Sequence, residues 1–190
     1  SAIITCTLTT RLKDHAKMSA QAAFRTKILF DTNQLLQRAK SEEEILSQTA
    51  SQLMKLLNRS LIVYPEQNGD LGSEQFFGVD GETTQNIFSA PEERDAANWT
   101  FANKKRSGAG TDSYPDAKGL YLALRTGGGV FGVIGIDLSE KPLDAFENSV
   151  LLSILGEGAL AIENRRNALE KEQAALPVSY THLTLPTTPY

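Results

Sequence analysis

The sequence has few of the side chains on which most enzymes and metalloproteins depend. Among its 190 residues there is one cysteine, Cys6, and there are two histidines, His15 and His182. One cysteine excludes an internal disulfide bond and a cysteine-based zinc site, and two distant histidines exclude a metal site built from several histidines. The composition therefore favours a domain with no catalytic residues, no metal site and no cofactor of its own.

Excess positive charge is also lacking. The 19 Lys and Arg residues are outnumbered by 23 Asp and Glu residues, and the formal net charge of −4 provides no electrostatic footprint for nucleic acid. Hydrophobic residues make up 41% of the chain and charged residues 22%, so we expect a packed core rather than general disorder. A chain of this length suits one domain with flanking elements.

The N-terminal end is apolar but short. Residues 1–8 are mostly apolar, and the cations Arg11, Lys13 and Lys17 follow them. This stretch is shorter than the roughly 20 apolar residues that span a bilayer. An apolar end followed by cations is typical of the cytoplasmic exit of a membrane helix, and an ordinary frayed N-terminus is the alternative.

The C-terminal residues differ in composition from everything before them. Residues 177–190 carry no charge and contain three prolines, directly after a highly charged segment. Val178–Tyr190 resembles the in-frame translation of a sequencing adapter. We therefore expect the natural sequence to end near Leu176 and residues 177–190 to form an artefactual disordered tail, so Tyr180 and His182 receive no functional role.

Hydrophobic periodicity predicts long helices on both sides of the central region, over residues 12–40 and 144–173. Each has apolar residues at heptad-like spacing, which is typical of a coiled-coil seam. The first predicted seam comprises Met18, Ala22, Leu29, Thr32, Leu36 and Ala39, and the second comprises Leu151, Leu155, Gly158, Ile162, Arg165 and Leu169. The two seams predict a homodimer formed through these flanking helices.

Shorter helices are expected between them. Ser41, with Glu44 three residues later, forms a capping box that predicts a helix ending near Asn58. Pro91 begins another helix that ends near Lys104.

Strands are predicted at 61–64, where Pro65 would end the strand, and at 75–79, with a loop over residues 80–89. Two more strands, at 119–125 and 130–137, are joined by a glycine turn and predict an antiparallel hairpin. Strands joined in this way favour an antiparallel sheet with helices packed on one face, which is an α+β fold.

One segment carries a specific motif. Trp99 lies in a predicted helix that leads to Gly108-Ala109-Gly110-Thr111-Asp112 and Pro115, and the strands Leu120–Leu124 and Phe131–Ile136 follow. This arrangement resembles the GAF domain of the KdpD family of potassium- and turgor-responsive sensor histidine kinases. The resemblance extends over roughly residues 4–175.

Three positions depart from the family pattern. Ser113-Tyr114 replaces Thr-Leu, Asp116 replaces Gly, and Ala123 replaces Pro. These departures concern the lining of any pocket rather than the resemblance itself.

The resemblance implies a domain organisation. Residues 1–10 would end a transmembrane helix, 11–40 would form a signalling helix, and 41–162 would form the GAF-like sensory domain. Residues 163–176 would begin a coiled-coil linker to a phosphoacceptor helix outside this chain.

The resemblance also implies a function. The chain would be a sensory and signal-relay domain at the cytoplasmic face of the membrane, responding to potassium limitation or osmotic state and regulating an autokinase. ATP, magnesium and the response regulator would bind domains outside this chain, which is itself expected not to be an enzyme. Its expected partners are a second copy, the rest of the kinase and the membrane at its N-terminus.

The candidate ligand-binding residues are the loop Gly108, Ala109, Gly110, Thr111 and Asp112, together with Trp99 and Tyr121. Glycines let a ligand approach exposed backbone N–H groups, and Asp112 could bind a cation such as potassium or cap the turn. The loop is not a P-loop, because the Lys-Ser/Thr pair is missing. A tight structural loop and ordinary core aromatics are the alternatives.

Other functions remain open at this point. A dimerisation and relay spacer without a ligand fits the same pattern, as does a stand-alone small-molecule-binding protein with the GAF fold. An enzyme of the methionine-sulfoxide reductase type would need reactive cysteines that Cys6 alone does not supply. Lys104-Lys105-Arg106 could contact anionic lipid or phosphate, or could be a solvated helix end.

Overall fold

The fold alternates long helices with short strands. The computed structural model describes residues 1–78 and 80–176, and the prediction for residues 177–190 lies outside them. Along the chain the elements are α1 (Ala2–Arg38), α2 (Glu42–Leu57), β1 (Leu61–Gln67), β2 (Asp70–Leu71), β3 (Gln75–Phe77), α3 (Gly81–Ile87), α4 (Pro91–Asn103), β4 (Ser107–Gly108), β5 (Gly119–Thr126), β6 (Gly129–Asp137) and α5 (Ala145–Ala175). The predicted α+β class is confirmed.

The strands form one antiparallel sheet in the order β2-β1-β6-β5-β4, and β3 also pairs with β1. The predicted hairpin is present as β5 and β6, which pair from Gly119↔Asp137 to Thr126↔Gly129. On its other side β6 pairs with β1, from Leu61↔Ile136 to Pro65↔Gly132. Strand β6 therefore lies in the middle of the sheet, between two strands that are far apart in sequence.

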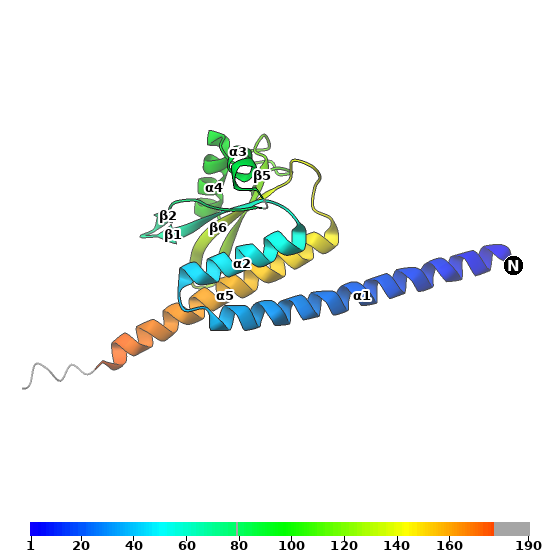
Figure 1. The fold of residues 1–190 in the computed structure, drawn as a ribbon, viewed down its shortest axis with the longest axis horizontal. Helices are drawn as coiled ribbons and strands as arrows, with labels where there is room; N and C mark the ends of the chain where they lie inside the picture. The colour runs from blue at the N-terminus through cyan, green and yellow to red at the C-terminus, as the bar shows by residue number, and fades with distance from the viewer. Residues whose placement is uncertain (79, 177–190) are drawn as a thin grey trace, which may run out of the picture.

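Helices cover both faces of the sheet, with α3 and α4 on one side and α2, α5 and α1 on the other (Figure 1). Alternate residues of β1 belong to two different cores. Leu61 and Val63 share a core with residues of α1, α2 and α5, whereas Ile62 and Tyr64 share a core with residues of α4. The prediction of helices on one face is therefore wrong for α4. Both faces of β1 are apolar, so each requires a cover.

Cap geometry confirms the predicted helix starts. The Ser41 hydroxyl accepts a hydrogen bond from Glu44 N at 3.1 Å at the start of α2. Asp144 and Glu147 form a complete capping box at the start of α5. Helix α2 ends as predicted at Asn58, which adopts the left-handed conformation.

Two local predictions are wrong. Strand β1 continues through Pro65 and does not end there. This residue lies between the part of β1 that pairs with β3 and the part that pairs with β2. The missing backbone N–H of proline therefore costs little at this position. Residues 81–87 form helix α3 instead of a loop. Asp80 caps this helix, and the hydroxyl of the buried Thr84 donates to Asp80 O at 2.7 Å.

Part of each heptad-like seam lies inside the domain, whereas Met18, Ala22 and Leu169 are exposed. Thr32 and Leu36 of α1, and Leu151, Leu155 and Ile162 of α5, are buried. Because these residues pack within one chain, their spacing reports the core face of each helix and does not by itself indicate a dimer. Helix α5 also has the length and apolar composition of a membrane span, and its buried face shows it to be a core helix of the domain.

Candidate functional site

The predicted ligand loop is closed by its own hydrogen bonds. Gly108 N donates to Ser113 O at 2.7 Å, and Thr111 N donates to Gly108 O at 3.1 Å. Ala109 N donates to Gly119 O at 2.9 Å. The Thr111 hydroxyl lies within 2.9 Å of both the Gly108 and the Ser113 carbonyl oxygens. These backbone N–H groups are engaged by the protein itself, so the geometry favours a structural loop.

Gly108 is a glycine because two parts of the chain approach closely there. Its φ is +89°, and an added Cβ would lie 2.0 Å from Gly119 O and 3.1 Å from the Tyr121 ring. The structure thus brings Gly108 and Tyr121 together, through the pairing of β4 with β5. Asp112 is exposed, and its side chain makes no hydrogen bond or ion pair to any described residue.

Removing the Asp112 carboxylate is expected to change little. In Asp112→Ala we expect the free energy of unfolding to stay within about 0.5 kcal/mol of the unaltered chain, because no native contact is lost. Isothermal titration with potassium chloride, using sodium chloride as reference and Asp116→Ala as the matched control, should give the same heats for all three proteins. A saturable potassium signal that is absent only in Asp112→Ala would restore the loop as a cation site.

Tyr121 lies at the centre of a buried polar network rather than in an open pocket. Its hydroxyl donates to Glu93 Oε2 at 2.6 Å, and burial, reinforced by this hydrogen bond, raises the pKa of Tyr121 well above its usual value. Glu93 is only 1% exposed and also accepts from Lys118 N at 2.6 Å and from Gly119 N at 3.1 Å. The network therefore fastens the start of α4 to the start of β5.

Glu93 is a buried residue of this network that no sequence motif singled out. The spacing of the buried residues in α4 is the sequence signal that could have identified Glu93. Glu93, Ala96, Ala97 and Thr100 all lie on one face of this helix. An acidic residue in the first turn of a helix is usually exposed, so the apolar pattern of this helix begins only at Ala96. Trp99 lies off this face and is half-buried.

A cavity of about 570 Å³ lies between one face of the sheet and helices α3 and α4. The residues that line it come from four separate segments of the chain. They are Ile62, Tyr64, Glu74, Phe76, Gln85, Phe88, Ser89, Ala90, Pro91 and Arg94. Neither Trp99 nor Tyr121 is among them. No local motif unites these residues, which is why the sequence alone did not reveal the cavity.

Arg94 organises the polar side of this cavity. Its guanidinium donates to Leu71 O at 2.9 Å and to Gly72 O at 3.1 Å, and it lies 4.8 Å from the centre of the Tyr64 ring. Glu74 is 3.7 Å away. Burial raises the pKa of Tyr64 to about 12, against the opposing charge of Arg94.

The chemistry of this cavity suits binding. Aromatic and aliphatic side chains surround a few hydrogen-bonding groups, as in small-molecule sites. Its lining contains no cysteine or histidine, and the described residues contain no cluster of potential metal ligands. The lining can therefore bind a small organic molecule. It presents no evident pair of a nucleophile and its base.

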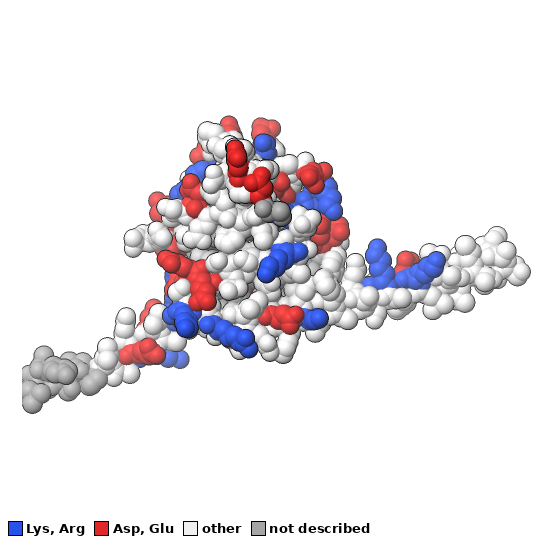
Figure 2. Space-filling view, in the orientation of Figure 1, with Lys and Arg blue, Asp and Glu red and all other residues white. Residues whose placement is uncertain are grey.

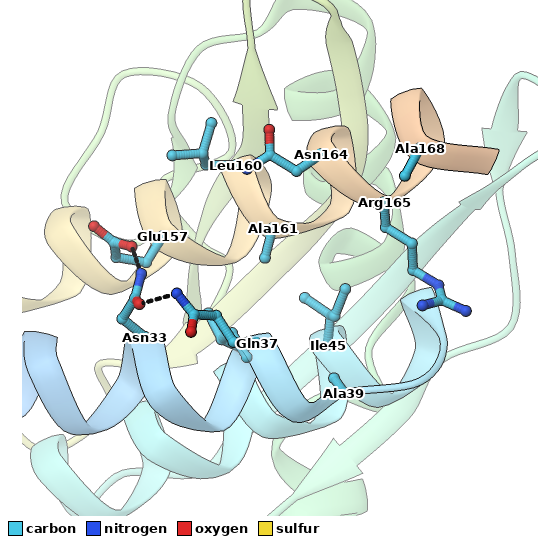
Figure 3. Close-up of a pocket in the computed structure, with 11 residues that line it drawn as sticks. Asn33, Gln37, Ala39, Ile45, Glu157, Leu160, Ala161, Asn164, Arg165 and Ala168 are labelled. Atoms are coloured by element: carbon cyan, nitrogen blue, oxygen red, sulfur yellow. Dashed lines mark hydrogen bonds between the residues drawn. The ribbon is translucent and has the colours of Figure 1, made fainter. Parts of the chain in front are cut away.

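Helices α1 and α5 lie side by side and run in the same direction. Arg25 donates to Ser153 Oγ at 2.8 Å, and further along both helices Asn33 donates to Glu157 Oε2 at 3.1 Å. Figure 3 shows the groove of about 320 Å³ between them. Asn33 and Gln37 of α1 face α5 across it and are joined by a hydrogen bond of 2.8 Å. The two helices are thus held in register by polar contacts.

Arg166 fastens the far end of α5 to the rest of the domain. It donates to both carboxylate oxygens of Glu42, at 2.9 and 2.8 Å, and to Glu66 Oε2 at 3.0 Å. It also lies 4.9 Å from the centre of the Phe131 ring. Hydrogen bonding to Glu42 raises the pKa of Arg166 above its already high value, so the residue remains a cation. Arg166 therefore joins α5 to α2, β1 and β6 at one point.

Comparisons with known proteins agree with the similarity that the motif predicted. Protein-family models give no match. The chain is similar to the sensor protein KdpD of Clostridium acetobutylicum, with 31% identity over 173 residues. This match takes in 90% of the chain and 19% of that protein, so the chain spans about a fifth of the length of this relative.

Solved structures with the same fold include GAF domains. One is the GAF domain of the potassium sensor histidine kinase KdpD from Escherichia coli, with a TM-score of 0.53, 20% identity, and coverage of 80% of this chain and 99% of that chain. Another is the GAF domain of an Acinetobacter phosphoenolpyruvate-protein phosphotransferase, with a TM-score of 0.53, 11% identity, and coverage of 76% and 95%. The chain thus has the fold of GAF domains, with long flanking helices, and its sequence is similar to that of a KdpD sensor protein, as the motif around Trp99 and Gly108–Asp112 predicted.

Proposed function

We propose that the chain is the sensory and signal-relay domain of a KdpD-like sensor histidine kinase, and that it regulates an autokinase in response to potassium limitation or osmotic state. The observation that carries this proposal is the in-line arrangement of α1 and α5. The two helices run in the same direction across one layer of the domain and project from opposite ends of it (Figure 1). A displacement that enters along α1 can leave along α5.

The start of α1 supports a membrane on the input side. Ile3, Ile4 and Leu8 are exposed. The hydroxyls of nearby threonines donate to backbone carbonyls four residues earlier, including Thr5 to Ser1 O and Thr10 to Cys6 O, so their donors are satisfied without water. In Figure 2 this uncharged end is followed along α1 by a group of charged side chains. That order suits a helix that leaves a bilayer on its cytoplasmic side.

The end of α5 supports an output beyond the domain. Arg166 makes the last of the polar contacts that join α5 to the sheet, and the side chains of residues 167–176 are exposed. Any rotation or shift of α5 therefore reaches the projecting end along the continuous helix, and the Arg166 contacts set the position of α5 against the sheet. A bias of a few kcal/mol between two arrangements is sufficient for such a relay.

Breaking the Arg166 contacts is expected to uncouple the relay. Residues 2–176 would replace the matching region of the Clostridium acetobutylicum protein, and autophosphorylation of the chimera in proteoliposomes would be measured at low and at high potassium. With Arg166→Ala we expect the ratio of the two rates to fall at least threefold towards 1, with a stability loss of about 1–2 kcal/mol.

Arg165→Ala is the matched control, because it removes the neighbouring cation of the same helix without removing an ion pair of the described residues. It should keep the full response. An unchanged response in Arg166→Ala, in a chimera that does respond, would contradict the relay and favour a passive spacer between helices.

The cavity beside α3 and α4 supports a second candidate function. Its 570 Å³ could hold a small organic molecule against Tyr64 and Arg94. Such a ligand would act on the same output, because β1 carries both Tyr64, on one face of the sheet, and Glu66, which binds Arg166. The domain would then integrate a chemical signal with the displacement of α1.

A further inference from the structure

A smaller cavity, of about 240 Å³, lies at the outer edge of β5, away from the cavity beside α3 and α4. Its lining combines four cations with an apolar wall. The cations are Lys104, Lys105, Arg106 and Arg125, and the other lining residues are Leu122, Ala123, Leu152, Leu155 and Gly156. No carboxylate takes part in this lining.

The local path of the chain creates this cavity. Helix α4 ends at Lys104, which adopts the left-handed conformation with a φ of +57°. Strand β4 then pairs only Ser107 with Tyr121 and Gly108 with Leu120. The residues before Ser107 consequently run past β5 without pairing to it, and the edge of β5 beyond Tyr121 has no strand beside it among the described residues.

The four cations are not neutralised by the protein. None of them forms an ion pair or a side-chain hydrogen bond with another residue in the described ranges, whereas Arg59, Arg94 and Arg166 each do. The chain as a whole has a net charge of −4. Gathering unpaired positive charge against low-dielectric walls, in a protein of negative charge, concentrates anions at that point.

Gly156 leaves the wall of α5 open beside the four cations. A glycine inside a helix is destabilising unless close packing requires it. At Gly158 packing requires it, because an added Cβ would lie 2.6 Å from Thr49 Oγ1. At Gly156 an added Cβ would find no atom within 4 Å. The neighbouring Leu152 is 46% exposed, so this part of α5 presents an open apolar surface.

We propose that this pocket, which we name the basic pocket, binds a phosphate group carried by a small soluble molecule. The guanidinium groups of Arg106 and Arg125 match the geometry of phosphate, and the two lysines add point charges. The wall formed by Leu152 and Gly156 receives the apolar part of the ligand. The volume lies just below the roughly 300–1,000 Å³ of typical small-molecule sites, so the ligand is no larger than a mononucleotide.

Titration calorimetry of the whole chain tests the charge requirement, with AMP, inorganic pyrophosphate and vesicles of phosphatidylglycerol as probes. We expect saturable binding of AMP and pyrophosphate. The double variant Lys105→Gln/Arg125→Gln should weaken both at least tenfold. Its matched control, Lys55→Gln/Lys171→Gln, removes two exposed cations elsewhere and should leave both affinities within twofold.

Three results of this titration would overturn the proposal. They are no saturable binding of AMP or pyrophosphate, equal weakening in the control, and binding to the vesicles alone. The last would assign the cations to a membrane surface.

Gly156→Leu tests the apolar wall in a protein that stays folded. The added side chain has open space, so circular dichroism should show an unchanged or higher melting temperature, while AMP affinity falls at least tenfold and pyrophosphate affinity falls less. Unchanged AMP affinity, together with a change of molar mass in light scattering, would mean that Gly156 faces a second copy and would overturn the proposal. The proposed relay can fail its own test independently, because these measurements involve no kinase.

Discussion

Glu93→Ala is expected to lower the free energy of unfolding by about 3–5 kcal/mol, because three donors lose a buried acceptor at once. The Tyr121 hydroxyl and the backbone N–H groups of Lys118 and Gly119 all point at the Glu93 carboxyl group. Left unpaired in the core, each would carry a desolvation cost. Urea denaturation followed by circular dichroism would measure the loss.

Two further variants make this prediction specific. Glu92→Ala removes an exposed carboxylate one residue away and should change stability by no more than about 0.5 kcal/mol. Tyr121→Phe removes one of the three donors, so it should lower the free energy of unfolding by less than Glu93→Ala does. The double variant should lower it by less than the sum of the two single losses. Equal and additive losses would mean that the network does not act as a unit.

The second large effect is expected at Gly108. Gly108→Ala should destabilise the fold by about 3 kcal/mol or more, because it combines a strained positive φ with a severe clash against Gly119 O. Gly110→Ala is the matched control. Its φ of +74° is also positive, but an added Cβ there meets no atom within 4 Å.

Gly110→Ala should therefore lower the free energy of unfolding only by the cost of the backbone strain, about 1 kcal/mol. The difference between the two variants measures how closely β4 must approach β5. If both variants lost the same small amount, the glycines of this loop would be required by something other than the fold, and a ligand at Gly108–Asp112 would regain support.

Glu93→Ala and Gly108→Ala both test the junction at which β4, β5 and the start of α4 meet. Gly108 and Tyr121 are both needed where β4, β5 and the start of α4 meet, and this junction lies on the face of the sheet opposite to α1, α2 and α5. Arg166 joins α5 to β1 and β6 from that other layer. A rigid sheet between the two layers is what the proposed relay requires, because displacement can pass through a stiff element without being absorbed.

The sequence by itself determined the elements whose signals are local. Ser41 with Glu44, Asn58 and Asp144 mark helix ends because capping involves residues only three or four positions apart. The β5–β6 hairpin follows from alternating apolar residues around a glycine turn. The motif from Trp99 to Pro115 is sufficient to indicate the GAF fold and the similarity to a KdpD sensor protein, because its spacing is specific and lies within one short segment.

Only the tertiary structure decided what each helix face contacts. The seam residues of α1 and α5 have the spacing of a coiled coil, yet the buried ones belong to a core within one chain, in which α5 packs on the sheet and α1 packs on α2 and α5. Periodicity reports an apolar stripe and not its partner. Helix α3 lacks such a stripe and depends on Asp80, Thr84 and the neighbouring sheet for its stability.

The tertiary structure also decided which residues form the buried network and the cavities. Glu92 and Glu93 are identical in sequence terms, and only the approach of β5 makes one of them a buried acceptor. The cavity around Tyr64 and Arg94, and the basic pocket at Arg125, are each assembled from segments far apart in the chain. Local sequence specifies caps, turns and apolar stripes, because these depend on near neighbours. Burial and cavities depend on contacts between distant segments, so they exist only once the chain has folded.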